Sequence, residues 1–198
     1  MSLTTYAELK SSVANWLNRT DLTAEIPDFI KLAESRIAHE VRLPTIEKTA
    51  SMTLNSQGAI AIPADFLELI DVFYNDKPLD RISLTQLRGL ASRSGLPVCF
   101  ARDGKEIVFF PTPSTQTDTL VVKYYYQVPD LSDSAPSNDL FATAPELYLF
   151  GALSEAATFL GADNSRWEQS YQTAFNRAVA HSRAADVAGS SPQIQSGY

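Results

Sequence analysis

The residues whose chemistry could support catalysis or metal binding are few and far apart. The two histidines, His39 and His181, have no partners at metal-ligand spacing, and the paired histidines of a zinc hydrolase helix are missing. Ser154 lacks the second glycine of a nucleophile elbow and lies in a predicted helix, which favours a packing role. Cys99, the single cysteine, lies in a predicted apolar strand, where burial raises the pKa of a thiol. The sequence therefore predicts no catalytic residue, no metal site and no bound cofactor.

Two carboxylate pairs are spaced closely enough to act as acid and base. They are Asp65 with Glu68, and Asp130 with Asp133. No flanking pattern places either pair in a cleft, and solvated surface acids are the favoured interpretation. The eight glycines are scattered singly, so the sequence has no glycine-rich loop that could hold a phosphate.

Three consecutive tyrosines, Tyr124 to Tyr126, form the most unusual local run. Aromatic side chains on a strand can stack unpaired bases, but such a platform needs several exposed rings in a basic groove. Strand alternation places Tyr124 and Tyr126 on the apolar face and leaves Tyr125 beside Lys123 on the other. The pattern favours a role for these rings in the core or in an interface.

Composition predicts one soluble folding unit, or one with a modest insertion. The 198 residues are 44% hydrophobic and 20% charged, as in an ordinary globular chain. No apolar run approaches the roughly 20 residues that span a bilayer, and the first residues lack a signal-peptide pattern. The net charge of -7 argues against a protein that binds nucleic acid through phosphate contacts. With one cysteine, the chain suits a reducing cytoplasm.

Helical patterns dominate the N-terminal part. Thr5 and Glu8 have the spacing of a capping box, which predicts a helix from Thr5 with an apolar stripe of Leu9, Val13, Trp16 and Leu17. A second helix is predicted from Pro27 to about Leu43, stopped by Pro44. Its two faces are predicted as a buried side (Phe29, Ile30, Ala33, Ile37, Val41) and a solvated side (Asp28, Lys31, Glu34, Arg36, Glu40, Arg42).

The middle of the chain changes to a period of two, which indicates strands. Residues 49–54 and 59–62 are predicted to form a hairpin around Gln57-Gly58, and Asp103-Gly104 predicts a second hairpin. The other predicted elements are a strand over 67–74, a short helix over 83–90 with its leucines inward, the hairpin strands 98–101 and 106–110, and a strand over 119–128.

The C-terminal part returns to helices after a loop over 129–138. Thr143 to Glu146 is predicted as a second capping box, followed by a helix whose apolar stripe is Leu147, Phe150, Leu153, Ala157 and Leu160, and then by a second stripe running to about Asp186. We therefore predict an α+β fold: helices 1–48 and 129–186 form one bundle, 49–128 form a β-rich insertion, and 187–198 form a flexible arm.

Several segments, in this order, resemble head-to-tail adaptor (connector) proteins of tailed bacteriophages, particularly the short-tailed ones. The resemblance runs from residue 5 to about 180. It is carried by Thr5-Tyr6-Ala7-Glu8-Leu9, Trp16-Leu17-Asn18-Arg19-Thr20-Asp21-Leu22, Ile26-Pro27-Asp28-Phe29-Ile30, Ala33-Glu34-Ser35-Arg36-Ile37, Ile62-Pro63-Ala64-Asp65-Phe66-Leu67-Glu68-Leu69, Gly95-Leu96-Pro97, Tyr124-Tyr125-Tyr126, Pro129-Asp130-Leu131-Ser132 and Ala144-Pro145-Glu146-Leu147-Tyr148-Leu149-Phe150-Gly151-Ala152-Leu153.

The resemblance implies a structural virion protein rather than an enzyme. Such adaptors form a dodecameric ring under the portal protein, extend the channel for DNA ejection, and receive the tail nozzle or tail tube. The implied location is the neck of the virion, after assembly in the host cytoplasm. An acidic channel lets DNA pass without gripping it. The arm is implied to dock on the portal or a neighbour, with Pro192, Ile194 and Tyr198 as its anchors.

Other classes of function stay open at this stage. A tail-completion or stopper protein of the phage neck is the nearest alternative, and ring stoichiometry and the contacted partner distinguish it from an adaptor. A virion-associated hydrolase would need an acid of raised pKa in a cleft. A nucleic-acid-binding module would bind with steep salt dependence, which the acidic composition disfavours.

Overall fold

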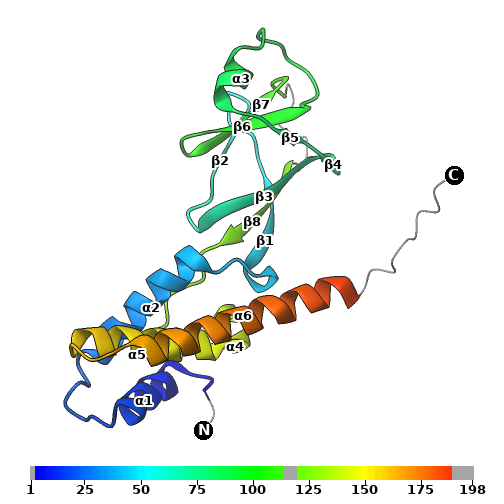
Figure 1. Cartoon of the computed structure of the whole chain (residues 1–198). Coiled ribbons are helices and arrows are strands. Elements are labelled where there is room, and N and C mark those ends of the chain that lie inside the picture. Colours follow the sequence, from blue (N-terminus) through cyan, green and yellow to red (C-terminus); the bar gives the residue numbers. More distant parts are fainter. Residues whose placement is uncertain (1–2, 114–119, 189–198) are drawn as a thin grey trace, which may run out of the picture. The chain divides into compact units, whose positions relative to one another are not determined.

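The computed structural model describes residues 3–113 and 120–188, and it confirms the α+β class (Figure 1). The chain divides into two compact units. One consists of Met1–Ile46 and Val128–Tyr198 and is built from α-helices, and we call it the helical unit. The other, Glu47–Gln127, contains the β-strands and one short helix, and we call it the β unit.

Helix α1 (Tyr6–Leu17) begins where its capping box predicts. The Thr5 hydroxyl accepts a hydrogen bond from the amide of Glu8, and the Glu8 carboxylate accepts one from the amide of Thr5 at 3.1 Å. Two otherwise unpaired backbone donors are satisfied in this way. The helix ends at Asn18, whose left-handed φ of 51° is typical of a helix C-terminus.

Helix α2 (Ile26–Glu40) ends earlier than predicted. Val41 is already extended, and Val41 and Leu43 are both buried as the chain leads into the 3₁₀-helix η1 (Pro44–Ile46). Pro44 disfavours helical geometry at the residue before it, so the chain straightens before the proline is reached. The predicted buried side of α2 is confirmed, because Phe29, Ile30, Ala33, Ile37 and Val41 are all at most 4% exposed.

The second predicted capping box is wrong. Thr143 is the last residue of an extra short helix, α4 (Asp139–Thr143), and its hydroxyl donates to the carbonyl of Asp139 at 2.9 Å. Asn138 caps α4 by accepting from the amide of Phe141. Helix α5 (Pro145–Phe159) starts without a side-chain cap, after Ala144. Proline at the first position of a helix removes one of the unpaired amides of the helix start and has a φ that suits the helix, so α5 can begin there without a side-chain cap.

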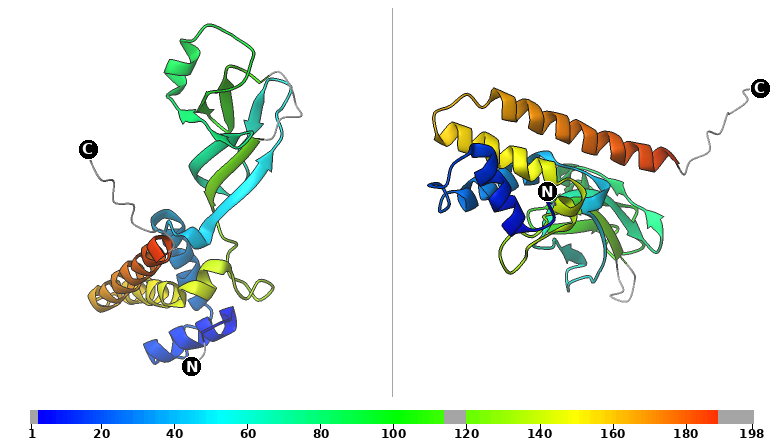
Figure 2. Two further views of the ribbon diagram at one scale, coloured as in Figure 1. Left: turned by 90° about the vertical axis from the view of Figure 1, so that its right-hand side faces the viewer. Right: turned by 90° about the horizontal axis from the view of Figure 1, so that it is seen from below.

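Helix α5 is the centre of the helical unit. It contacts α1, α2, α4 and α6 (Ser165–Ala188), and nine of its 15 residues are buried, so its single predicted apolar stripe is too narrow. Gly151 permits the closest approach, since a Cβ placed there would lie 2.9 Å from the Cβ of Ala33 on α2. Figure 2 shows α5 and α6 side by side along their length. The wider bundle arrangement stays a prediction.

Two four-stranded sheets make up the β unit. The first has the order β1 (Glu47–Met52), β8 (Leu120–Tyr126), β3 (Phe66–Tyr74) and β4 (Lys77–Pro78). The second has the order β2 (Ala59–Ala61), β7 (Glu106–Phe110), β6 (Cys99–Asp103) and β5 (Asp80–Arg81). Buried residues from both sheets, including Val72, Tyr124, Phe100 and Ile107, join in one apolar cluster.

The predicted hairpin of residues 49–54 with 59–62 is wrong. β1 pairs with β8 and β2 pairs with β7, so these neighbouring strands belong to different sheets. Asn55 turns the chain between them, because its side-chain oxygen accepts from the amides of Gln57 and Ala59 while its Nδ2 donates to Glu106 on β7 at 3.1 Å. β2 therefore pairs in the second sheet and not with β1.

The hairpin around Asp103-Gly104 is confirmed as β6 and β7, with Gly104 at a φ of 62°. Gly104 meets the need of this turn for a left-handed residue without a side-chain penalty. The short helix α3 (Leu84–Arg88) is also confirmed, with Ser83 as its cap. Its leucines are not buried as predicted: Leu84 and Leu87 are half-buried and Leu90 is 43% exposed.

Candidate interaction surface

The residues singled out for chemistry lie apart in the structure. His39 and His181 are exposed on α2 and α6. Ser154 is buried inside α5, as the helical interpretation predicts, and its hydroxyl donates to Glu168 over a long 3.4 Å. Cys99 is buried in β6, where burial raises the pKa of its thiol. None of these four residues lies next to another of the four.

The predicted carboxylate pairs are divided among separate contacts. Asp65 forms an ion pair with Lys48 at 2.6 Å and accepts a hydrogen bond from the Tyr124 hydroxyl at 3.1 Å. Partial burial acts to raise the pKa of Asp65, but the bonds from Lys48 and Tyr124 outweigh it and lower the pKa. Asp133 pairs with Lys10 at 2.8 Å. A carboxylate held ionised by a cation is a poor general acid.

The tyrosine run belongs mainly to the packing of the β unit. Tyr124 is 1% exposed and stacks on Phe66, with ring centroids 5.6 Å apart. Tyr125 and Tyr126 are half-buried, and Lys48 lies 5.7 Å from the centroid of the Tyr126 ring. The interpretation of Tyr124 as a core residue is confirmed.

A charged network fixes α2 against α6. Arg36 donates two parallel hydrogen bonds to Glu168, at 2.7 and 2.5 Å, and a third to Glu40 at 3.0 Å. The Tyr171 hydroxyl also donates to Glu40 at 3.0 Å, and the Arg36 guanidinium stacks 4.1 Å from the Tyr171 ring centroid. The hydrogen bonds from Arg36 lower the pKa of Glu168 to about 2. Sequence reasoning missed this network, although the four-residue spacing of Arg36 and Glu40 was a local sign of it.

Glu34 departs most from its predicted place. Assigned to the solvated side of α2, it is 9% exposed, and its carboxylate accepts a hydrogen bond from the amide of Leu131 at 2.7 Å. Burial raises the pKa of Glu34 to about 7, against the lowering effect of that hydrogen bond and with help from the nearby charge of Asp130. Because its partner is a backbone amide, Glu34 anchors the segment that enters α4.

The most distinctive exposed feature is an aromatic and basic surface on α1, α5 and α6. Trp16 is 46% exposed, although its spacing predicted a buried stripe. Its ring centroid lies 6.0 Å from that of Phe150 and 5.6 Å from that of Trp167, both edge to face. The Arg166 guanidinium lies 4.8 Å from the Trp167 ring centroid. With Arg177, these residues form what we call the aromatic–arginine surface: Trp16, Phe150, Arg166, Trp167 and Arg177.

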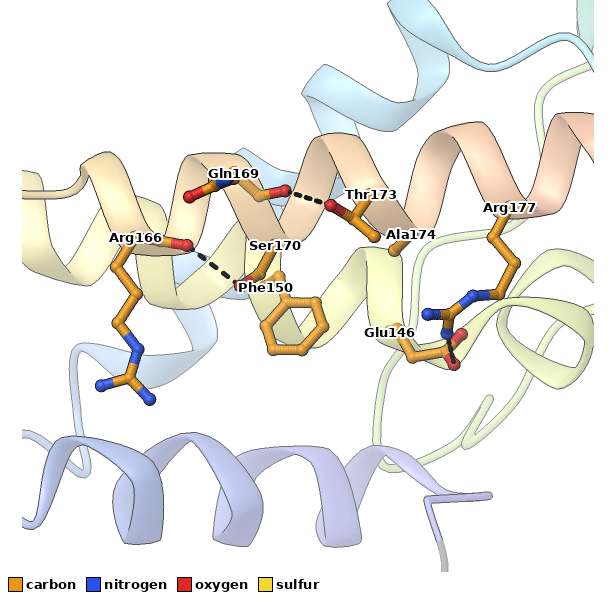
Figure 3. Close-up of a pocket in the computed structure, with 8 residues that line it drawn as sticks. All are labelled: Glu146, Phe150, Arg166, Gln169, Ser170, Thr173, Ala174 and Arg177. Atoms are coloured by element: carbon orange, nitrogen blue, oxygen red, sulfur yellow. Dashed lines mark hydrogen bonds and ion pairs between the residues drawn. The ribbon is translucent and has the colours of Figure 1, made fainter.

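A hollow of about 460 Å³ lies within this surface. Its lining is Glu146, Phe150, Arg166, Gln169, Ser170, Thr173, Ala174 and Arg177. Figure 3 shows Phe150, Arg166 and Arg177 pointing to the same side of α5 and α6, the side on which α1 lies. Arg177 is 69% exposed and only loosely paired with Glu146, at 3.5 Å. Its guanidinium can therefore still accept an outside acidic partner.

The composition of this surface is that of a protein-binding site. Tryptophan and arginine are the residue types that most often dominate binding energy at protein interfaces. An apolar floor with a few polar groups at the rim also fits the general anatomy of interfaces. Such an arrangement is suited to bind and orient a partner protein.

Other apolar side chains are exposed as well. In the helical unit they are Phe159 at 61%, Leu32 at 53% and Leu160 at 36%. In the β unit they are Leu96 at 72%, Val98 at 59% and Leu90 at 43%, and Leu96 and Val98 lie just before β6. Exposed apolar residues that gather on one element commonly mark contacts with other proteins.

The described residues show neither a candidate metal-binding group nor a helix that could span a membrane. Across residues 3–113 and 120–188, the acidic, histidine and cysteine side chains nowhere gather in a group of three that could hold a metal ion. Within the same residues, each helix is too short or too polar to cross a membrane.

Comparison with known families shows which family the chain belongs to. The model of the SU10 adaptor protein family matches residues 4–195. The chain belongs to this adaptor family. Membership confirms the resemblance to head-to-tail adaptors of tailed phages, and it identifies a phage structural protein. A search of curated proteins gave no match.

The adaptor family implies a place in the neck of the virion and contacts with portal and tail proteins. The three residues predicted to anchor the arm of this adaptor, Pro192, Ile194 and Tyr198, lie outside the described residues. Helix α6 extends to Ala188, two residues into the segment 187–198 assigned to the arm.

Proposed function

We propose that this adaptor forms a dodecameric ring under the portal protein, extends the DNA channel and provides the attachment site for the tail. The family match over residues 4–195 carries the proposal. The aromatic–arginine surface supports it, because a subunit of a closed ring must expose surface that its neighbours cover. The net charge of -7 supports a channel that repels DNA rather than binding it.

The two units are proposed to divide the work. Residues 1–48 and 129–186 would pack around the channel and bind the portal, whereas residues 49–128 would contact neighbours and the tail nozzle or tube. The arm over 187–198 would dock on the portal or a neighbour through Pro192, Ile194 and Tyr198.

Binding to the portal is the property that separates an adaptor from a stopper or tail-completion protein. Purified portal rings incubated with the chain should sediment with a fixed ratio of adaptor to portal before any tail protein is added. Binding only after another neck protein is present would instead support the stopper. A chain without residues 187–198 tests the arm separately: it should fold normally and bind portal rings more weakly, and unchanged binding rejects the arm's role.

A further inference from the structure

The helical unit carries a second exposed patch whose character complements the aromatic–arginine surface. It lies where α5 turns into α6, and we call it the α5–α6 corner: Glu155, Phe159, Leu160 and Asp163. Phe159 is 61% exposed, and its ring is braced at 5.3 Å, centroid to centroid, by the buried ring of Phe29. The corner is therefore apolar and held in place, although it is open to solvent.

The charges of the corner are negative. Glu155 lies one helical turn before Phe159, on the same side of α5, and is half-buried. Asp163 accepts hydrogen bonds from the amide and hydroxyl of Ser165, at 2.9 and 2.8 Å, and these bonds lower the pKa of Asp163. At neutral pH an ionised carboxylate thus belongs to the corner, four residues after the exposed aromatic ring.

The aromatic–arginine surface carries two arginines against the single acid Glu146, and it has a hollow to receive an apolar side chain. Arg166 and Arg177 flank the floor formed by Phe150 and Ala174. One patch offers a protruding ring with acids, and the other offers an apolar hollow with guanidinium groups. The two patches share no residue, so a contact between them is heterologous and can repeat around a ring.

We propose that the α5–α6 corner of one copy inserts into the aromatic–arginine surface of the next copy, in a head-to-tail contact that repeats around the ring. This inference rests on the proposed function, because it names the neighbour that covers the surface. Phe159 provides the apolar anchor in the hollow. Glu155 and Asp163 pair with the arginines at its rim and set the orientation of the neighbour.

Cross-linking tests the pairing directly. In a Cys99→Ser background, Leu160→Cys and Thr173→Cys place one thiol on the corner and one on the rim of the hollow, since Thr173 is exposed there. Rings are assembled on portal rings and treated with a short bismaleimide. Every copy then carries both halves of the contact, so denaturing gels should show a ladder of dimers, trimers and higher products.

Matched controls separate this contact from other arrangements. Each single-cysteine variant should stay monomeric, because a heterologous contact never brings two identical residues together. The pair Ser35→Cys with Thr173→Cys uses an exposed site on α2 and should give no ladder. Dimers from a single-cysteine variant, or rings that form without a ladder, overturn the inference. Failure of the unmodified chain to form rings on portal overturns the proposed function instead.

Charge reversal gives a second readout that does not depend on cross-linker geometry. Arg166→Glu alone and Glu155→Arg alone should each weaken assembly by about tenfold or more, because like charges then face each other across the contact. The chain with both reversals places the swapped charges opposite each other and should recover most of the loss. Two losses that simply add in the combined variant contradict the pairing.

Discussion

Replacing Glu34 by glutamine should make the helical unit more stable at neutral and alkaline pH. Glu34 is buried on α2 and accepts a hydrogen bond from the amide of Leu131. Glutamine keeps an oxygen for that bond but carries no charge. It therefore removes the cost of burying a carboxylate while the contact remains.

The size of the effect follows from the pKa of Glu34, which is raised from 4.5 to about 7. Each pKa unit corresponds to about 1.4 kcal/mol, so the full difference is worth at most about 3.5 kcal/mol. Between pH 4.5 and pH 7, Glu34 of the folded chain holds a proton that the unfolded chain has lost. The stability of the protonated form is thus fully present below pH 4.5 and is lost as the pH rises through 7.

Urea denaturation from pH 5 to pH 8.5 measures this directly. Both tryptophans, Trp16 and Trp167, belong to the helical unit, so their fluorescence follows its unfolding. The glutamine variant and the unmodified chain should have similar free energies of unfolding at pH 5. At pH 8 the variant should be more stable by about 2–3 kcal/mol.

A matched control removes the same charge from a less buried glutamate. Glu155→Gln, on half-buried Glu155, should shift the free energy of unfolding by less than about 0.5 kcal/mol at either pH. Parallel pH profiles for the Glu34→Gln variant and the unmodified chain refute the reasoning, because a buried glutamate that titrates normally has no such linkage. Direct observation of the Glu34 carboxyl by NMR would then show an ordinary pKa.

Three further substitutions test the packing of the helical unit. Gly151→Ala should destabilise it by about 1–2 kcal/mol in urea denaturation, because the new methyl group meets Ala33 and the overpacking exceeds the gain in helix propensity. Thr5→Ala should cost about 1 kcal/mol by the same measurement, since it removes the cap of α1. Arg36→Leu should lower the free energy of unfolding by about 1–3 kcal/mol, a range reduced because Glu168 is partly exposed. This loss should shrink as the pH falls from 4.5 towards 2, because Glu168 then takes up a proton and no longer pairs with Arg36 as an anion.

Each of these three predictions has a matched control variant. Gly89→Ala puts a methyl group 3.4 Å from the nearest backbone atom, so it should be tolerated where Gly151→Ala is not. Thr143→Ala should cost clearly less than Thr5→Ala, because Thr143 caps no helix. Arg42→Leu removes a neighbouring arginine that donates to backbone carbonyls at the end of α2. If Arg42→Leu lowers the free energy of unfolding as much as Arg36→Leu does, the pairing of Arg36 with Glu168 does not explain the effect of Arg36→Leu.

Local signals in the sequence were reliable wherever the structure is decided within a few residues. The caps at Thr5 and Ser83 and the turn at Asp103-Gly104 each depend on neighbours in the chain, and all three lie where they were predicted. The second capping box failed for an equally local reason. Pro145 opens α5 with no amide to cap, and Thr143 serves an earlier helix instead.

Features that depend on distant parts of the chain could not be predicted. Glu34 is buried because Leu131, 97 residues away, lies against it. β1 pairs with β8 rather than with its neighbour β2, and β8 lies about 70 positions later in the chain. The aromatic–arginine surface likewise needs α1 and α6 to meet over Phe150, so Trp16 was assigned to the core by its spacing alone.

A cryo-EM reconstruction of the phage neck would reveal both the ring and the contact between its copies. We expect a closed ring of this adaptor between the portal and the first tail protein, with one copy's α5–α6 corner seated in the next copy's aromatic–arginine surface. A neck without this chain, or with the chain bound as separate copies that do not touch each other, would contradict this expectation.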